Sequence, residues 1–161
     1  NQHYIKSIDI SELIQHLQWH LEQRSIDINS GPRIEDVVES LRDRSKTLVE
    51  MANSCVMFYQ NFATFDEKQA NKQFSSKSQP IIEALYSKLS ALDIWNAEAV
   101  HGEIQGVCEQ QGVGFGKVGQ PFRLALSGDG KAGSIDVCAE LVGKNRTLAR
   151  LQMAVDYIKA L

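Results

Sequence analysis

The last part of the chain, from Lys117 onward, contains start and stop signals for consecutive helices, and these signals constrain the fold more than any other feature. Pro121 suits the first residue of a helix, because an N–H group at that position has no helical acceptor. Gly128 can end the same helix in a left-handed conformation. Ser134 can cap the next helix, which Gly143 can end. The punctuation therefore predicts short helices packed closely together.

Apolar residues recur at helical spacing along nearly the whole chain, and no segment shows the alternation typical of a strand. Asn145 can cap the last helix, whose apolar stripe contains Leu148, Leu151, Val155 and Ile158. We predict five further helices. One follows Asp9, one runs from Arg33 to Tyr59, one covers Glu67–Gln73, one follows Pro80 and one begins near Asn96.

The segment Gly112–Gly119 contains four glycines and is expected to be a loop. It is the best internal boundary that the sequence offers. We therefore expect an all-α, two-lobed fold, with a helical bundle in residues 1–112 and a three-helix subdomain in residues 113–161.

Composition restricts the class of protein. Apolar residues make up 43% and charged residues 23% of the chain, which is typical of a globular protein. No apolar run approaches the roughly 20 residues of a membrane helix, and the first residues lack a secretory signal. The cysteines at positions 55, 108 and 138 are too far apart for a CxxC metal pair, so we expect buried thiols in a cytoplasmic protein.

Residues that carry chemistry are sparse. The sequence has no glycine-rich phosphate loop and no nucleophile elbow. His16 and His20 have the i, i+4 spacing of a metal chelate, but no third ligand is evident, and we interpret them as residues at the edge of an amphipathic helix. We expect no catalytic residue, no metal and no cofactor in this chain.

Charge is distributed unevenly. The net charge is −3, yet from Lys117 onward seven basic residues face four acidic ones. A mildly basic end suits local contact with RNA, where unstacked loop bases are read by hydrogen bonds and stacking. Arg44 and Arg123 are candidate readers, because a guanidinium fork can do both. The alternatives are a solvated Arg44 and an Arg123 that pairs with Asp129 or Asp136.

Several motifs resemble those of one family. The segments Lys117–Gly128 and Leu141–Leu151, with Trp95-Asn-Ala-Glu98, are similar to the C-terminal anticodon-binding region of bacterial glutamyl-tRNA synthetases. The family also has a stretch similar to Leu41-Arg-Asp-Arg-Ser-Lys-Thr-Leu48. The resemblance spans nearly the whole chain and implies the helical anticodon-binding fold of a class I synthetase.

The resemblance also implies roles for particular residues. Arg44 matches the arginine associated with the third anticodon base, and Arg123 matches one that contacts anticodon bases. Ile135 keeps the aliphatic residue of a turn that contacts the anticodon in the family, although Ala132-Gly133 replaces its usual Ser/Thr-Pro. Lys117 and Lys131 are further candidates, since lysines on loops can approach phosphates.

If the resemblance holds, the partner is the anticodon loop of a glutamate tRNA, and neither DNA nor a membrane is expected. The parent enzyme would couple glutamate to the tRNA with ATP and magnesium in a catalytic domain that this chain lacks. We expect a monomer. Two alternatives stay open: a helical protein-interaction module that does not bind RNA, and the anticodon domain of a class I lysyl-tRNA synthetase.

Overall fold

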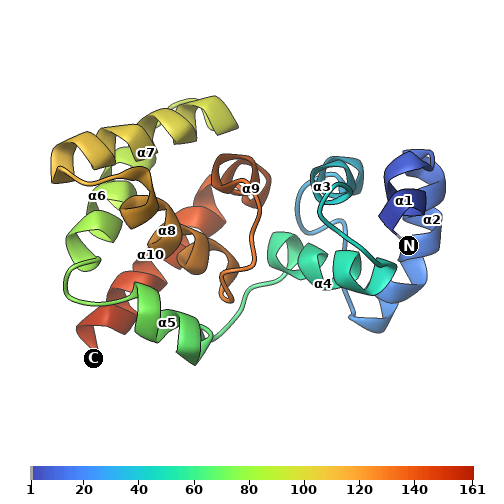
Figure 1. Cartoon of the computed structure of the whole chain (residues 1–161), viewed down its shortest axis with the longest axis horizontal. Helices are drawn as coiled ribbons and strands as arrows, with labels where there is room; N and C mark the ends of the chain where they lie inside the picture. Colours follow the sequence, from blue (N-terminus) through green and yellow to red (C-terminus); the bar gives the residue numbers. More distant parts are fainter. Residues whose placement is uncertain (1) are drawn as a thin grey trace. The chain divides into compact units, whose positions relative to one another are not determined.

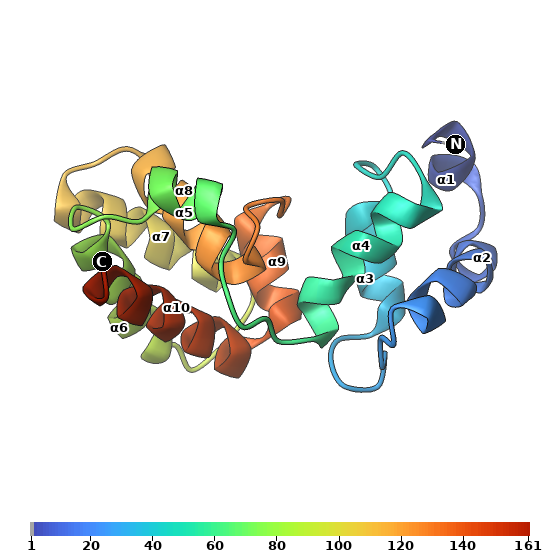
Figure 2. The same cartoon turned by 90° about the horizontal axis from the view of Figure 1, so that it is seen from below.

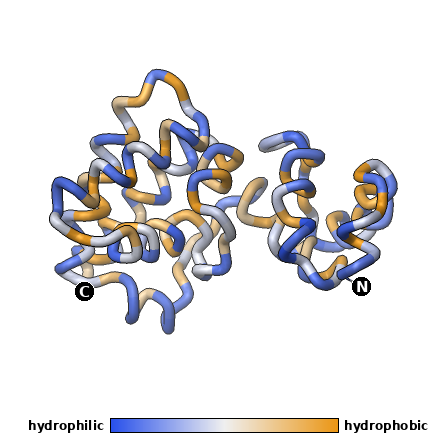
Figure 3. Tube along the Cα trace, turned by 45° about the horizontal axis from the view of Figure 1, so that its top comes forward, coloured by the Kyte–Doolittle hydropathy of each residue, from blue (hydrophilic) through white to orange (hydrophobic). Residues whose placement is uncertain are grey.

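The computed structural model describes residues 2–161, which form ten α-helices and no strand (Figure 1). Asn1, where the first expected subdomain begins, lies outside the described residues. The helices are α1 Gln2–Ser7, α2 Ile10–Gln23, α3 Ile34–Leu41, α4 Leu48–Tyr59, α5 Glu67–Gln73, α6 Gln79–Ser90, α7 Ala97–Gln111, α8 Phe115–Ser127, α9 Ile135–Val142 and α10 Lys144–Lys159. Hydrophobic and hydrophilic residues alternate every few positions along them (Figure 3), as amphipathic helices require. The expected all-α class is confirmed.

The chain divides into two compact units, one ending at Asn61 and the other beginning at Phe62. The boundary expected at residue 112 falls inside the second unit. The physical reason is packing: α6 and α7, which precede Gly112, pack against α8, α9 and α10, which follow it. Helix α10 lies along α6 (Figure 2), so both sides of the glycine-rich segment share one core.

The first unit begins with a capped helix, as expected. The Asp9 carboxylate accepts a hydrogen bond from the N–H of Ser11 at the start of α2. Leu13, Leu17 and Leu21 of this helix are at most 5% exposed. The apolar stripe that the sequence shows is therefore the buried face of α2.

The prediction of a single helix from Arg33 to Tyr59 is wrong, because the chain forms two helices there, α3 and α4, with a break between them. Thr47 caps α4: its hydroxyl accepts the N–H of Glu50 at 3.0 Å, and the Glu50 carboxylate accepts the N–H of Lys46 at 2.8 Å. The Thr-x-x-Glu pattern is that of a capping box, although Glu50 accepts the N–H of the residue before the N-cap and not that of Thr47 itself, and the apolar periodicity conceals this helix start. Arg44 therefore lies on a turn and not at the edge of a helical stripe.

Arg42, two residues before Arg44, has a structural role. Its side chain is 13% exposed. One guanidinium nitrogen donates to the backbone carbonyls of Ile5, Lys6 and Ile8, at the end of α1 and just beyond it. Carbonyls at a helix end have no helical donor, so this arginine supplies one and ties α1 to the turn after α3.

In the second unit, α8 begins at Phe115, so Pro121 lies inside the helix and not at its start. The loop expected at Gly112–Gly119 is likewise helical from Phe115 onward. Val118 and Phe122 are both 0% exposed, and burying this pair stabilises the extra helical turns more than glycine and one lost hydrogen bond destabilise them. The burial of a helix face has overridden local propensity.

The glycines predicted to end helices do so, whereas two of the predicted N-caps differ from the expectation. Gly128 ends α8 and Gly143 ends α9, both with positive φ. Ser134 is at the N-cap position of α9, but its hydroxyl donates to the Asp136 carboxylate at 2.5 Å and makes no cap to the backbone. Asn145 lies within the first turn of α10, whose N-cap is Gly143. Gly143, with its positive φ, is the single residue between α9 and α10.

A buried arginine holds α10 to α8. Arg150 is 4% exposed, donates to the carbonyl of Leu126 at 2.7 Å and lies 4.9 Å from the centre of the Phe62 ring. Burial, together with the nearby charge of Arg146, lowers the pKa of Arg150 to about 10. The guanidinium still stays protonated at neutral pH, where it meets the carbonyl-rich end of α8.

Cys55 and Cys138 are buried, which confirms the expectation of buried thiols for these two residues, whereas Cys108 is partly exposed. Burial raises the pKa of the Cys55 thiol to about 12, despite the opposing charge of Arg24. No helix between residues 2 and 161 combines the length and the apolar character needed to cross a bilayer.

Replacing Gly128 with alanine is expected to destabilise the second unit. Gly128 has φ of 80°, and a Cβ there would lie 3.1 Å from the Phe62 ring. The left-handed conformation alone costs a side chain about 1–2 kcal/mol. Gly102→Ala, inside α7 with no atom within 4 Å of its Cβ position, is the matched control and should stabilise by about 0.5–1 kcal/mol. Urea midpoints that move in the same direction for both variants would contradict this expectation.

Candidate nucleic-acid interface

Arg123 projects from α8 toward the turn before α9. Its terminal nitrogen donates to the carbonyl of Gly133 at 3.4 Å, a long hydrogen bond. Its Nε is buried and has no hydrogen-bond partner among residues 2–161. An unsatisfied buried N–H costs about 1–3 kcal/mol. Because this atom is shielded from solvent, a ligand would reach Arg123 through the exposed part of its side chain. Arg123 is thus held in place by one weak contact and retains donors for a ligand.

Neither acid proposed as a partner for Arg123 pairs with it. Asp129 accepts the N–H of Lys131 at 2.8 Å. Asp136 accepts the Ser134 hydroxyl and the Val137 N–H, and lies 3.7 Å from a ring nitrogen of His101. The structure therefore contradicts the structural ion pair, which was the alternative to a binding role.

The other basic candidates are exposed. Arg44 lies on the turn between α3 and α4, where its N–H donates to the carbonyl of Leu41 at 3.2 Å. No ion pair holds its guanidinium to another described residue. Lys117 lies in the first turn of α8, and Lys131 lies in the loop before α9. Charged side chains in these places are open to a polyanion.

Ile135 occupies a different environment. Its side chain is 4% exposed, and one of its methyl carbons would lie 3.1 Å from a Cβ at position 119. The side chain packs beneath α8, where Gly119 leaves room for it. Ile135 therefore positions the turn 132–134 against α8, next to the carbonyl that Arg123 contacts.

The structure brings some of the candidates together. Arg123 and Ile135 meet at the turn before α9, and Lys131 belongs to the loop that leads into it. Arg44 belongs to the first unit. Within residues 2–161, no group of three His, Cys, Asp or Glu side chains is arranged to hold a metal ion. His16 instead contacts the Tyr4 hydroxyl at 3.2 Å.

Comparison with known proteins shows what this chain is similar to. A family model described as "Anticodon binding domain" matches residues 12–155. The chain is 52% identical over 157 residues to a protein named glutamate–tRNA ligase from Vesicomyosocius okutanii, and 51% identical over 156 residues to one from Ruthia magnifica. These alignments cover 98% and 97% of this chain but 34% of each relative. The chain thus spans about a third of the length of these relatives.

Solved structures share the fold. A glutamate tRNA ligase from Elizabethkingia meningosepticum, in complex with its amino acid, superposes with a TM-score of 0.84 at 24% identity, over 98% of this chain and 31% of that one. A glutamate-tRNA synthetase from Elizabethkingia anophelis gives a TM-score of 0.79 at 23% identity, over 96% and 30%. At this level of identity the likeness establishes the fold.

Proposed function

Since this chain belongs to the anticodon-binding domain family, we propose that it recognises the anticodon loop of a glutamate tRNA within a glutamate–tRNA ligase. The observation that supports this most strongly is Arg123, a partly exposed arginine that no carboxylate among the described residues neutralises. Such a group suits the acceptor atoms and flat faces of unstacked bases.

Each candidate residue has a distinct part in this proposal. Arg44 reads the third anticodon base, and Arg123 contacts anticodon bases beside the turn 132–134. Ile135 positions that turn, while Lys117 and Lys131 approach phosphates. The exposure of Arg44, Lys117 and Lys131 and the burial of Ile135 are consistent with these parts.

The chemistry of the whole protein is part of the same proposal. The ligase joins glutamate to its tRNA at the expense of ATP, which magnesium accompanies, in a domain other than this one. This chain contributes selection of the tRNA and no catalytic residue. Of the alternatives, neither the lysyl enzyme nor the interaction module is favoured by relatives that are named glutamate–tRNA ligases.

Replacing Arg44 with glutamine is expected to weaken the preference for C over G at the third anticodon position. Loss of one two-pronged contact reduces discrimination by about 1–2 kcal/mol, a scale taken from DNA bases. The fold should be unaffected, because Arg44 is exposed on a turn. Filter binding of two stem-loops that differ at this base, at fixed salt, measures the preference.

The matched control is Arg33→Gln. Arg33 is also an exposed arginine of the first unit, with a 75% exposed side chain 3.7 Å from Glu35. Both variants lose one positive charge, so an equal weakening of all RNA binding is expected for each on charge grounds alone. If Arg44→Gln and Arg33→Gln discriminate between C and G as the original protein does, Arg44 is not a reader.

A further inference from the structure

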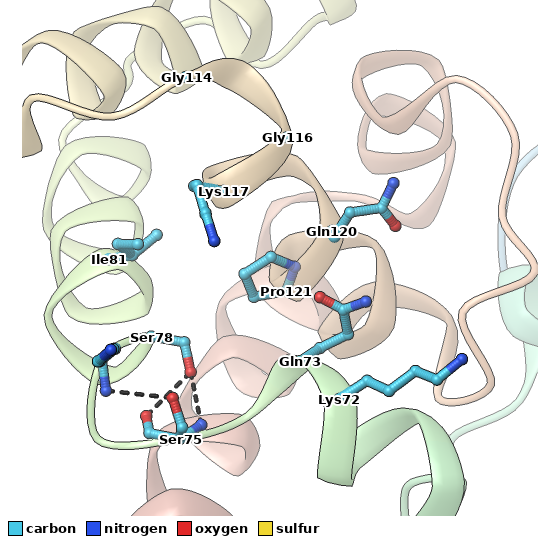
Figure 4. Close-up of a pocket in the computed structure, with 11 residues that line it drawn as sticks. Lys72, Gln73, Ser75, Ser78, Ile81, Gly114, Gly116, Lys117, Gln120 and Pro121 are labelled. Carbon is cyan, nitrogen blue, oxygen red and sulfur yellow. Dashed lines mark hydrogen bonds between the residues drawn. The ribbon is translucent and has the colours of Figure 1, made fainter.

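A cavity of about 530 Å³ lies within the second unit, between the end of α5, the turn before α6 and the first half of α8 (Figure 4). Cavities of this size accommodate small ligands. None of Arg123, Lys131 and Ile135 lines it. The cavity is therefore a feature distinct from the turn at which Arg123 lies.

The lining of this cavity is basic. Lys72, Lys77 and Lys117 line it, and no aspartate or glutamate does. The side chain of Lys117 points from α8 into the open space facing α6, whereas that of Lys72 extends away from Lys117 (Figure 4). No ion pair neutralises any of the three amines within residues 2–161. The three positive charges around the cavity repel one another, and a bound anion would offset this repulsion.

The backbone at the start of α8 adds to this positive potential. Gly114 is the N-cap and offers no side-chain acceptor, and the first turn contains no acidic residue. The N–H groups of Phe115 and Gly116 have no hydrogen-bond partner among the described residues. Lys117 in that first turn adds a cation at the positive end of the helix dipole, an unfavourable placement that a bound anion would reverse.

The glycines at this helix start leave the backbone accessible. A Cβ at Gly114 or at Gly116 would meet no atom within 4 Å, and neither residue has a positive φ. Packing and backbone strain therefore do not require glycine at either position. What the missing side chains do provide is open access to the unpaired N–H groups.

We propose that this cavity binds a phosphate group, and that in the RNA complex the group is a backbone phosphate of the anticodon arm. The choice of RNA as the source rests on the proposed function. Lys117 and the N–H groups of α8 contact the phosphate, and Lys72 and Lys77 supply longer-range attraction. Gln73 and Gln120, which also line the cavity, can hydrogen-bond an adjoining ribose.

The first test is the salt dependence of RNA binding by the full chain. Affinity for a labelled anticodon stem-loop is measured between 50 and 200 mM salt for the original protein, Lys117→Gln and Lys159→Gln. Lys159 is an exposed lysine at the end of α10, outside the cavity, and is the matched control. Each lost contact to a single-stranded phosphate lowers the logarithmic slope by about 0.7.

We expect that decrease for Lys117→Gln, an unchanged slope for Lys159→Gln and unchanged discrimination between anticodon bases in both. A slope for Lys117→Gln equal to that of the original protein would overturn the proposal, and with it the phosphate contact of Lys117, while leaving anticodon recognition by Arg44 and Arg123 intact.

The second test identifies the ligand without RNA. Inorganic phosphate is titrated into the labelled protein at constant ionic strength, with chloride as the reference anion, and the amide resonances of Gly116 and Lys117 are followed. Shifts with phosphate and not with chloride support the cavity as a phosphate site. If these shifts occur while no RNA binds, the phosphate site stands and the proposed function fails. Absence of both effects refutes both.

Discussion

Replacing Arg123 with glutamine should reduce discrimination between the cognate anticodon and its base variants by about 2–3 kcal/mol, or roughly 30- to 150-fold. This exceeds the effect expected for Arg44, because the Arg123 guanidinium is partly buried and its hydrogen bonds are less screened by water. The variant also loses the hydrogen bond to Gly133, so the turn before α9 is held less firmly. Titration of stem-loops with single base changes at fixed salt measures the loss.

Arg123→Lys separates base reading from general attraction. Lysine keeps the charge but lacks the planar fork, so the salt dependence of binding should persist while the preference among bases falls. The expectation fails if lysine restores the preference, because then charge alone is sufficient. It also fails if glutamine leaves the preference unaltered.

Replacing Arg42 with methionine should destabilise the first unit by about 2–4 kcal/mol. Methionine retains the apolar stem but removes the donors to the carbonyls of Ile5, Lys6 and Ile8. Hydrogen bonds from a charged group contribute about 1.5–3 kcal/mol, and the carbonyls of Ile5 and Ile8 are in partly buried hydrogen bonds. Amide hydrogen exchange in α1 and α2 reports the loss.

Arg33→Met is the control for this experiment. Arg33 is an arginine of the same unit, but it is largely exposed and makes one ion pair with Glu35 at 3.7 Å. Such surface pairs contribute about 0–1 kcal/mol. Comparable protection of α1 and α2 in the two variants would mean that the contacts of Arg42 do not hold α1 in place.

The elements that sequence predicts well are those whose signals are local. Asp9 and Asn96 cap their helices with a side-chain oxygen, as their chemistry favours, and Gly128 and Gly143 end theirs. Apolar spacing continues across the break before α4 and conceals it, although the Thr47 cap and Glu50 mark it. Local signals decide where a helix starts, and periodicity decides which face is buried.

Features that depend on tertiary packing could not be predicted in this way. The first turns of α8 form because Val118 and Phe122 are buried, against the preference of Gly119 and Pro121. The boundary at residue 61 likewise depends on which helices pack together, and the glycines near residue 112 gave no information on that. Glycine indicates freedom of the backbone, not the edge of a core.

The candidate site follows the same division. The resemblance identified Arg123, yet its unpartnered Nε and the absence of a neighbouring acid are visible only in three dimensions. Because the side chain of Ile135 is buried, we expect this residue to position the turn 132–134 and not to contact the anticodon. The sequence does not indicate Lys72 and Lys77 as candidates, because a polar segment rich in lysine is ordinarily a solvated surface. The cavity that they share with Lys117 depends on the packing of α5 against α8.

The central claim is that this chain distinguishes one anticodon from others. The most direct measurement compares its dissociation constants for the anticodon stem-loop of glutamate tRNA and for the same stem-loop with all three anticodon bases replaced, at one salt concentration. We predict at least about 30-fold tighter binding of the first, which corresponds to the smallest discrimination expected from Arg123 alone. Equal dissociation constants for the two stem-loops would contradict the claim.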